Sequence, residues 1–368
     1  DAFSEGTIHA DTEGEIRRNW ANRIKLADAY AAQLAETFAS ISPKLERNVE
    51  PLDLSSSNAP GWPDQPALAR FRDDRVELFR RMFGRILGGL HVDAAGLFAL
   101  IDELIDKLVL YPERFTQLAL LTPRKRDYLP DHAYTTAVLA IAIAARMGCC
   151  RADVRLAGMS GLVCDLGMGL IPRDIRTAKR KLNEIEINRI HRHPAFSVVL
   201  LDEVADLPDQ VRMAALQHHE RDNATGYPSR LRAAKICDLA RIVAVADNFA
   251  AATEPRPYKH RKKPYDAIEE LIVMGSQHVF DRRVVRALVE SCGLFPVGSY
   301  VRLSTSEIAV VIGAHADNVD RPIVRVAATD PSEPPETRDL KEYEPWELSV
   351  ISAVEAPPSL RRHLRAAG

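Results

Sequence analysis

The amino-acid sequence predicts a mainly α-helical protein, with a helical segment at the N-terminus and a small β unit at the C-terminus. Three patterns lead to this fold class. Apolar residues recur at steps of three and four over residues 13–42. Between residues 131 and 252, apolar helical runs follow one another and are interrupted only by isolated polar residues. After residue 296, short stretches rich in Val and Ile are separated by turn residues, which is typical of strands.

Residues 1–66 are expected to form an N-terminal helix and a linker. The apolar positions of the helix are Ile16, Trp20, Ile24, Ala27, Ala31, Leu34, Phe38 and Ile41. Their mean spacing of about 3.5 residues is that of a coiled coil, which predicts a homodimer joined through residues 13–42. An amphipathic helix that lies on the rest of the chain explains the same pattern equally well. The Pro- and Ser-rich residues 50–66 predict the linker.

Residues 67–122 predict a helical segment that leads into the core. One helix is expected over residues 67–90 and a second over residues 93–110, where Asp93 is a suitable N-cap. Residues 296–368 predict a β-rich extension, with strands within 297–303, 308–312 and 321–326 and a loop at 331–338.

Residues 123–295 predict the central helical domain. Asp131 can cap a helix that begins at His132, and Asn183 with Glu186 makes a capping box for a helix that reaches His193. Further helices are expected over residues 156–166 and 236–252.

Composition excludes some classes of function. The formal net charge is -2, so the chain lacks the basic balance of a DNA-binding protein. No apolar run reaches the about 18 residues of a membrane span. Five cysteines stand in or beside apolar runs without the spacing of a disulfide framework, which indicates a reducing, cytoplasmic compartment. Because the sequence begins at Asp1, an upstream sensory or receiver domain is expected.

Polar residues that interrupt the apolar helices predict a metal centre. They are His132, Cys164, Asp165, His193, His218, His219 and Asp247. Imidazole, carboxylate and thiolate are the usual protein ligands of first-row divalent metals, and a carboxylate among histidines can bridge two of them. A single histidine on a helix is more often a satisfied core residue than a ligand. So many such residues on consecutive helices are harder to explain in that way.

These residues also carry a family resemblance. The order of His132, Asp165, His193, His218-His219-Glu220, Gly226-Tyr227-Pro228, Asp247 and Arg256-Pro257-Tyr258-Lys259 resembles that of HD-GYP domains. That family is the all-helical branch of the HD phosphohydrolases that cleaves cyclic di-GMP. The resemblance runs from about residue 92 to residue 295, and it implies an HD-type helical bundle.

The resemblance implies a role for each matching residue. The histidines, Asp165 and Asp247 would hold two divalent metals, iron or manganese, with Asp165 bridging them. Asp165 and Glu220 would serve catalysis. Arg256, Lys259 and Tyr227 would bind the substrate, which would be cyclic di-GMP or a related phosphodiester.

The chain departs from the family pattern at several positions. Cys164 replaces the histidine of the His-Asp pair, and a cysteine ligand would favour zinc. Met168 and Ala178 replace lysines, although Lys179 and Arg180 follow closely. Asn223-Ala224 replaces Asp-Gly, and Ala224 is expected to divert the loop because alanine disfavours a positive φ. Tyr128 stands where some members carry a glutamate that serves a third metal.

Two functions therefore remain open at the level of sequence. The first is a metal-dependent phosphodiesterase that opens cyclic di-GMP to the linear dinucleotide or to GMP. The second is a catalytically degenerate regulatory module that binds metal, nucleotide or a partner protein without turnover, as the changes at Cys164, Met168, Ala178 and Asn223-Ala224 suggest.

Overall fold

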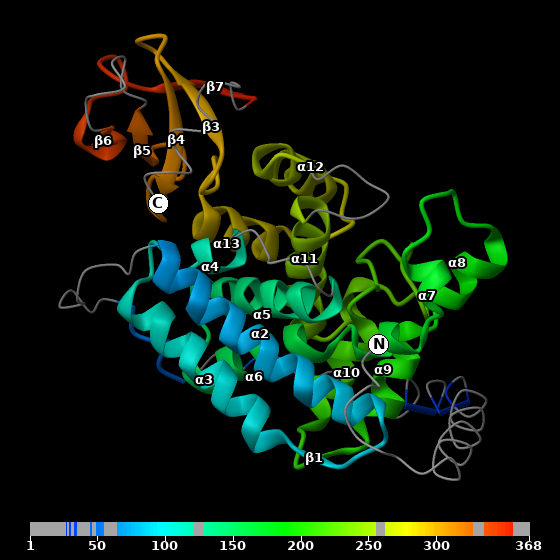
Figure 1. Cartoon of the computed structure of the whole chain (residues 1–368). Coiled ribbons are helices and arrows are strands. Elements are labelled where there is room, and N and C mark those ends of the chain that lie inside the picture. The colour runs from blue at the N-terminus through cyan, green and yellow to red at the C-terminus, as the bar shows by residue number, and fades with distance from the viewer. Residues whose placement is uncertain are drawn as a thin grey trace.

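The computed structural model describes residues 65–120, 128–254, 262–326 and 335–355, together with residues 27, 29–30, 33–34, 45 and 49–54. In this part of the chain, α-helices pack into a bundle and a small sheet extends from its C-terminal end (Figure 1). The predicted mainly α fold class with a small C-terminal β unit is confirmed.

The first two helices run close to the predicted ranges. Helix α2 covers Gln65–Leu87 and α3 covers Ala94–Leu110. Asp93 caps α3 as expected, because its side chain accepts a hydrogen bond of 2.7 Å from the backbone N–H of Ala95. The short strand β1 (Val92–Asp93) precedes α3 and pairs in parallel with β2 (Val204–Ala205).

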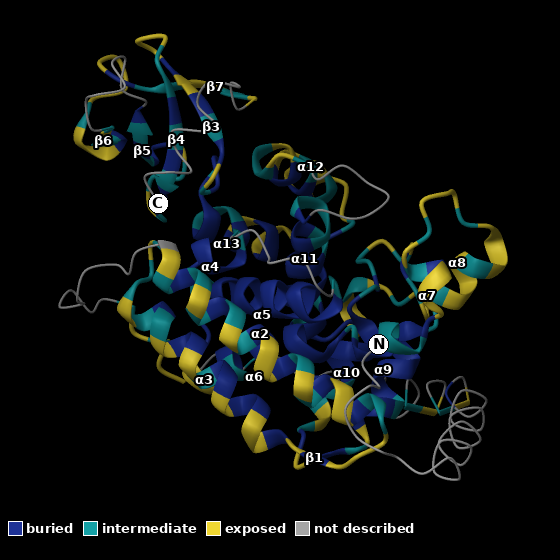
Figure 2. Cartoon of the chain, in the orientation of Figure 1, coloured by how far each residue is buried: buried dark blue, intermediate teal, exposed yellow. Residues whose placement is uncertain are grey.

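Helix α5 (Tyr128–Arg146) lies at the centre of the bundle and is buried along nearly its whole length (Figure 2). It packs against α2, α6, α11 and α13. It begins four residues earlier than predicted, so Asp131 is not its N-cap. Instead, the Asp131 carboxylate forms a buried ion pair with Arg72 of α2, in which Nη2 and Oδ1 are 2.8 Å apart.

The remaining helices complete the bundle. They are α4 (Gln117–Leu120), α6 (Arg151–Val163), η1 (Leu166–Leu170), α7 (Arg173–Arg176), α8 (Glu184–Ile190), α9 (His193–Leu201), α10 (Asp209–Gln217), η2 (Ala233–Lys235), α11 (Asp238–Thr253), α12 (Pro264–Ser276) and α13 (Arg282–Cys292). The capping box of Asn183 and Glu186 is present at the start of α8. That helix ends at Ile190, however, and His193 opens α9, where Pro194 occupies the first turn.

One hydrophobic core serves the segments predicted as 67–122 and 123–295. Its buried residues run from Leu68 in α2 to Cys292 in α13. A smaller cluster joins Ala27 to Ile171, Ile175 and Phe196. The described part of the N-terminal helix therefore lies on the bundle at Ala27, as an amphipathic helix does. The predicted dimer through residues 13–42 stays a prediction.

The C-terminal sheet is antiparallel, with strand order β6-β5-β4-β3-β7. Its strands are β3 (Tyr300–Leu303), β4 (Ile308–Gly313), β5 (Ile323–Val326), β6 (Glu336–Asp339) and β7 (Val350–Val354). The predicted loop at 331–338 is wrong at its end, since β6 begins at Glu336 and pairs with β5. The polar sequence of β6 concealed it, because an edge strand needs no apolar face.

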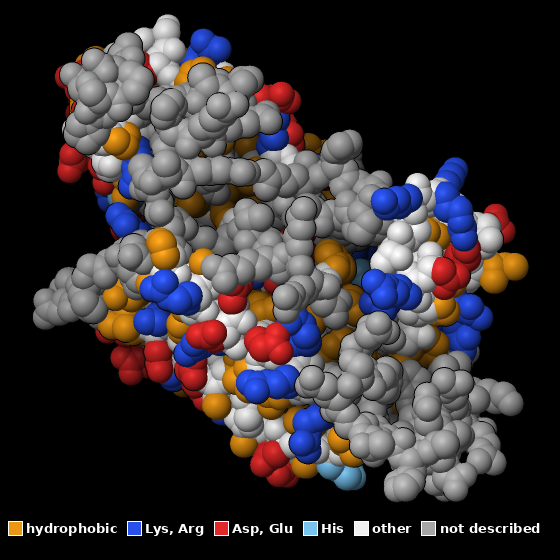
Figure 3. Space-filling view, in the orientation of Figure 1, with side chains coloured by type: hydrophobic (Ala, Val, Ile, Leu, Met, Phe, Trp, Pro, Cys, Tyr) orange, Lys and Arg blue, Asp and Glu red, His pale blue; other side chains and the backbone are white. Residues whose placement is uncertain are grey.

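Within the described part of the chain, every helix is too short or too polar to cross a membrane. Acidic and basic side chains are mixed on the face that carries α2 and α3 (Figure 3). This face therefore lacks the single-sign charge of a nucleic-acid-binding surface.

The Arg72–Asp131 pair is expected to be a large contributor to stability. Arg72 is 1% exposed and Asp131 is 6% exposed, so removal of the cation leaves a buried, uncompensated carboxylate. We expect Arg72→Met to lower the free energy of unfolding by about 3 kcal/mol, measured by urea denaturation. The double variant Arg72→Met/Asp131→Leu should recover most of the loss. A single variant within about 1 kcal/mol of wild type, about a fivefold change in the folding equilibrium, would contradict this assignment.

Candidate metal centre

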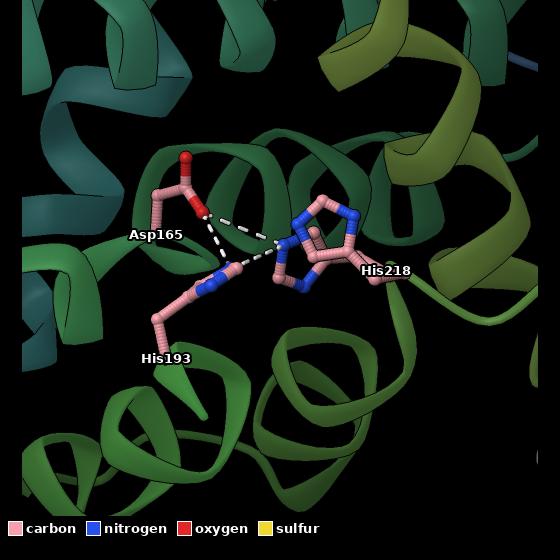
Figure 4. A group of neighbouring side chains, drawn as sticks. Asp165, His193 and His218 are labelled. Atoms are coloured by element: carbon pink, nitrogen blue, oxygen red, sulfur yellow. Dashed lines mark hydrogen bonds and ion pairs between the residues drawn. The ribbon is translucent and has the colours of Figure 1, made fainter. Parts of the chain in front are cut away.

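Three helix ends and a turn meet at Asp165. This residue lies where α6 ends and η1 begins, His193 is the first residue of α9, and His218 caps the C-terminus of α10. The three side chains point toward one another from these separate elements (Figure 4). His219 follows His218 directly and joins them. We refer to Asp165, His193, His218 and His219 as the His-rich group.

The ligand atoms of the His-rich group all lie within 4.8 Å of one another, as a metal site requires. Oδ1 of Asp165 is 3.0 Å from Nε2 of His193 and 3.5 Å from Nε2 of His218. The two Nε2 atoms are 3.3 Å apart. His193 and His218 are almost completely buried, so these two ligands are shielded from water.

A second group forms around the other oxygen of Asp165. His132 of α5 places Nε2 2.9 Å from Oδ1 of Asp247, which belongs to α11, and 3.4 Å from Oδ2 of Asp165. These ligand atoms also lie within 4.8 Å of one another. We refer to His132, Asp165 and Asp247 as the carboxylate-rich group. Asp165 thus presents one oxygen to each group, which is the arrangement of a bridging ligand.

The donor set fits divalent metal ions. Nδ1 of His193 is 2.7 Å from the carbonyl oxygen of Ile190, and Nδ1 of His218 is 2.8 Å from that of Ala215. A carbonyl oxygen only accepts, so each Nδ1 donates, and Nε2 is the nitrogen of each ring that is available to a metal ion. Two such nitrogens and a carboxylate oxygen converge. Only a cation between them, a metal ion or a proton, makes this arrangement favourable.

The electrostatics of the centre agree with this arrangement. Burial opposes ionisation of Asp165, but hydrogen bonds from His132 and His193 outweigh it and lower the pKa of the carboxyl group well below its ordinary value. Burial also lowers the pKa of His219 well below its ordinary value, and the neighbouring His218 adds to this effect. Asp165 is therefore an anion and His219 a neutral ring, and these are the states in which both side chains bind metals.

Ser197 holds the turn that carries Asp165, and the sequence analysis did not identify it. Its hydroxyl donates to the carbonyl oxygen of Cys164 at 2.5 Å and accepts from the N–H of Gly167 at 2.8 Å, so its two hydrogen bonds straddle Asp165. A side chain at Gly167 would place Cβ 2.1 Å from the carbonyl oxygen of His193, so only glycine allows α9 to approach this closely. A lone serine in an apolar helix was the available signal.

Glu220 is placed as a support for the loop that follows the two histidines. Its Oε1 accepts from the N–H of Ser229 at 2.7 Å, and its Oε2 accepts from the N–H of Leu231 at 2.8 Å. Each oxygen accepts from the backbone, so Glu220 supports this loop, and its expected catalytic role stays a prediction. Gly226 is required by close approach as well, since a Cβ there would lie 2.4 Å from the carbonyl oxygen of His219.

Tyr227 contacts the centre through its ring. It stacks with His219 at a centroid distance of 4.6 Å and with His191 at 4.0 Å. These contacts support the orientation of His219, and the substrate-binding role of Tyr227 stays a prediction. Ala224 was expected to avoid a positive φ, and this is wrong, because it adopts the left-handed conformation with φ +64°.

The structure places two departures from the family pattern outside the metal groups. Cys164 was predicted as a ligand, but its Sγ lies 3.5 Å from the carbonyl oxygen of Gly161, to which the thiol donates, and it joins neither group. Burial raises the pKa of this thiol well above its ordinary value, which keeps it protonated. Met168 is half-buried and packs against apolar residues of the core.

The cations that could compensate for Met168 lie elsewhere or are engaged. Arg180 forms two hydrogen bonds with Glu186, of 2.7 and 2.6 Å, and Lys179 is exposed. Basic side chains are visible around the protrusion formed by α7 and α8 (Figure 3). Arg256 and Lys259, the predicted substrate ligands, lie outside the described residues.

Comparisons with known proteins agree with this geometry. The HD domain family matches residues 104–284. The chain is 32% identical over 245 residues to "Cyclic di-GMP phosphodiesterase PA4108" of Pseudomonas aeruginosa, which covers 67% of this chain and 58% of that protein. It is 35% identical over 165 residues to "Cyclic di-GMP phosphodiesterase response regulator RpfG" of Xanthomonas campestris pv. campestris, which covers 43% of each protein.

A solved structure supports the fold. "Bd1817, a HDG"Y"P protein from Bdellovibrio bacteriovorus" aligns with a TM-score of 0.51 and 14% identity, over 73% of this chain and 79% of that one. The fold, the two groups of candidate metal ligands and these matches define the class: the chain carries an HD domain over residues 104–284. The chain covers less than two thirds of the length of the two curated relatives.

The positive φ at Ala224 allows a prediction about the free energy of unfolding. Alanine in the left-handed region is strained relative to glycine, so Ala224→Gly is expected to raise the free energy of unfolding by about 1 kcal/mol, measured by chemical denaturation. The control is Ala99→Gly at an exposed position inside α3, where glycine should lower it by about 1 kcal/mol. Equal destabilisation by both substitutions would show that Ala224 does not hold a positive φ in solution.

Proposed function

We propose that this protein is a metal-dependent phosphodiesterase that opens cyclic di-GMP, or a closely related cyclic dinucleotide, to the linear product. The observation that carries the proposal is the division of the Asp165 carboxylate. Its Oδ1 faces the His-rich group and its Oδ2 faces the carboxylate-rich group. A carboxylate shared in this way suits two metal ions that act together on one phosphodiester.

The roles of the residues follow from their positions. His193, His218 and His219 would hold one ion, His132 and Asp247 would hold the other, and Asp165 would bridge them. Bound divalent ions would supply a hydroxide nucleophile at neutral pH and neutralise charge on the phosphate during in-line attack. Arg256 and Lys259 are the residues expected to hold the substrate phosphates. Because the donors are nitrogen and oxygen, we propose iron or manganese as the metal.

Asp165 provides the direct test. Asp165→Ala is expected to abolish turnover and metal retention together, because both groups lose the shared ligand. Turnover would be measured anaerobically with iron(II) or manganese(II), with the products separated by chromatography and metal content determined by mass spectrometry. Asp174→Ala, an exposed position in α7, is the matched control and should behave as wild type. Undiminished activity of Asp165→Ala would rule out the mechanism.

A degenerate regulatory module is the second candidate, and Met168 favours it. The family lysine at this position is absent, and Arg180 is engaged by Glu186. In this case the protein would hold metal and bind the cyclic dinucleotide without releasing product. Calorimetry and product analysis on the same metal-loaded sample separate the two candidates.

Met168→Lys tests how much catalysis the missing cation costs. If a lysine at this half-buried position supplies the cation that the family lysine is expected to supply, turnover should rise by about 10². The control Met168→Leu keeps the apolar volume and should leave the rate unchanged. If both variants turn over at the same rate, the cation at this position does not limit catalysis in this protein.

A further inference from the structure

Glu254 is a buried carboxylate that reaches the metal centre without belonging to either metal-holding group. It follows α11 as its C-cap, and its backbone N–H donates to the carbonyl oxygen of Ala250 at 3.0 Å. Its Oε2 lies 2.8 Å from Nδ1 of His132. Glu254 is 8% exposed and His132 is 1% exposed, so this contact is shielded from water.

The position of Glu254 is unfavourable for an anion by itself. The C-terminal end of a helix carries a partial negative charge, which repels a carboxylate. Burial adds the loss of hydration, and Oε1 of Glu254 is buried without a hydrogen-bond partner among the described residues. A carboxylate in this environment needs a nearby positive charge, and the carboxylate-rich group is the place where a cation would supply it.

The contact also determines which nitrogen of His132 faces the metal group. An ionised carboxylate only accepts, so Nδ1 of His132 donates the hydrogen bond that Glu254 accepts. Nε2 is then the nitrogen available to a metal ion, and it faces Asp247 at 2.9 Å and Asp165 at 3.4 Å. Tyr128 stacks on the ring with a centroid distance of 5.2 Å, so the ring is held at its edge and at its face.

We propose that Glu254 is a positioning residue that orients His132 and adds negative charge behind it, so that it strengthens metal binding in the carboxylate-rich group only. The inference rests on the proposed metal-dependent function. His193 and His218 direct Nδ1 at neutral backbone carbonyls, so the His-rich group has no corresponding charged partner among the described residues. The two groups should therefore respond differently to the loss of Glu254.

The experiment is a manganese(II) titration of the full chain by calorimetry, with bound metal counted by mass spectrometry. Glu254→Gln keeps the size and an acceptor oxygen but removes the charge. We expect the affinity of one of two sites to fall about 10- to 100-fold while the other site is unchanged. Glu254→Ala, which also loses the hydrogen bond, should weaken the same site further. Circular dichroism confirms that each variant is folded.

Reference variants identify which site is lost. The titration of Glu254→Gln should resemble that of Asp247→Asn and differ from that of His219→Ala, because Asp247 and His219 belong to different groups. Asp281→Asn is the matched control for loss of a buried carboxylate. Its partners are Arg241 and Arg283 and it caps α13, so it should lower stability and leave both metal sites intact.

The outcomes separate the inference from the proposed function. Two metal sites in Glu254→Gln with wild-type affinity would overturn the role of Glu254 while leaving the dinuclear enzyme in place. Weakening of both sites to the same degree would also overturn it, since the effect would not be confined to one group. A wild-type protein that binds no metal would overturn the proposed function and this inference together.

Discussion

Ring nitrogens face carboxylate oxygens and one another at the centre of the helical bundle, and the rest of the structure is arranged around this constraint. Nδ1 of each of three histidines is engaged by an acceptor, so Nε2 is the nitrogen that each ring directs at the centre. Buried carboxylates and ring nitrogens gathered in this way are costly unless a cation, a metal ion or a proton, lies between them. The packing of α5, α9, α10 and α11 therefore creates a strong demand for positive charge at one point.

The backbone meets this constraint as much as the side chains do. Asp165 can face both groups only if the turn after α6 is held firmly, and Ser197 holds it through hydrogen bonds on either side. Gly167 allows α9 to come close enough to place His193. On the other side of the centre, Glu220 closes the loop behind His219 through two backbone N–H groups. The site thus depends on close backbone contacts that tolerate few substitutions.

The helices and all six residues of the two groups of candidate metal ligands could be predicted from the sequence, because apolar periodicity and isolated polar residues are local signals. The contacts of Glu254 and Ser197 could not. Glu254 meets His132 across 122 positions of the chain, and no spacing rule connects them. The start of α5 was misplaced because Asp131 has the chemistry of a cap but is used in a buried ion pair with Arg72. In each case tertiary packing decided between local alternatives.

The loop at Ala224 is a second case in which tertiary contacts override what the sequence predicts. Alanine disfavours a positive φ by about 1–2 kcal/mol, which is less than the contacts that close this loop can supply. Glu220 anchors its far end, and Asn223 accepts hydrogen bonds from both the N–H and the hydroxyl of Thr225. The intrinsic preference of one residue is overridden because several contacts act on the same short segment.

The two metal-holding groups share Asp165 but differ in chemistry. One has three imidazoles and one carboxylate, and the other has one imidazole and two carboxylates, with Glu254 behind it. Nitrogen donors suit iron and zinc, whereas a group dominated by oxygen favours harder ions such as manganese or magnesium. The sulfur of Cys164 was the reason to expect zinc, and that sulfur faces Gly161. If both groups hold metal as proposed, their donors argue for two unlike sites, of which the carboxylate-rich one would suit the harder ion.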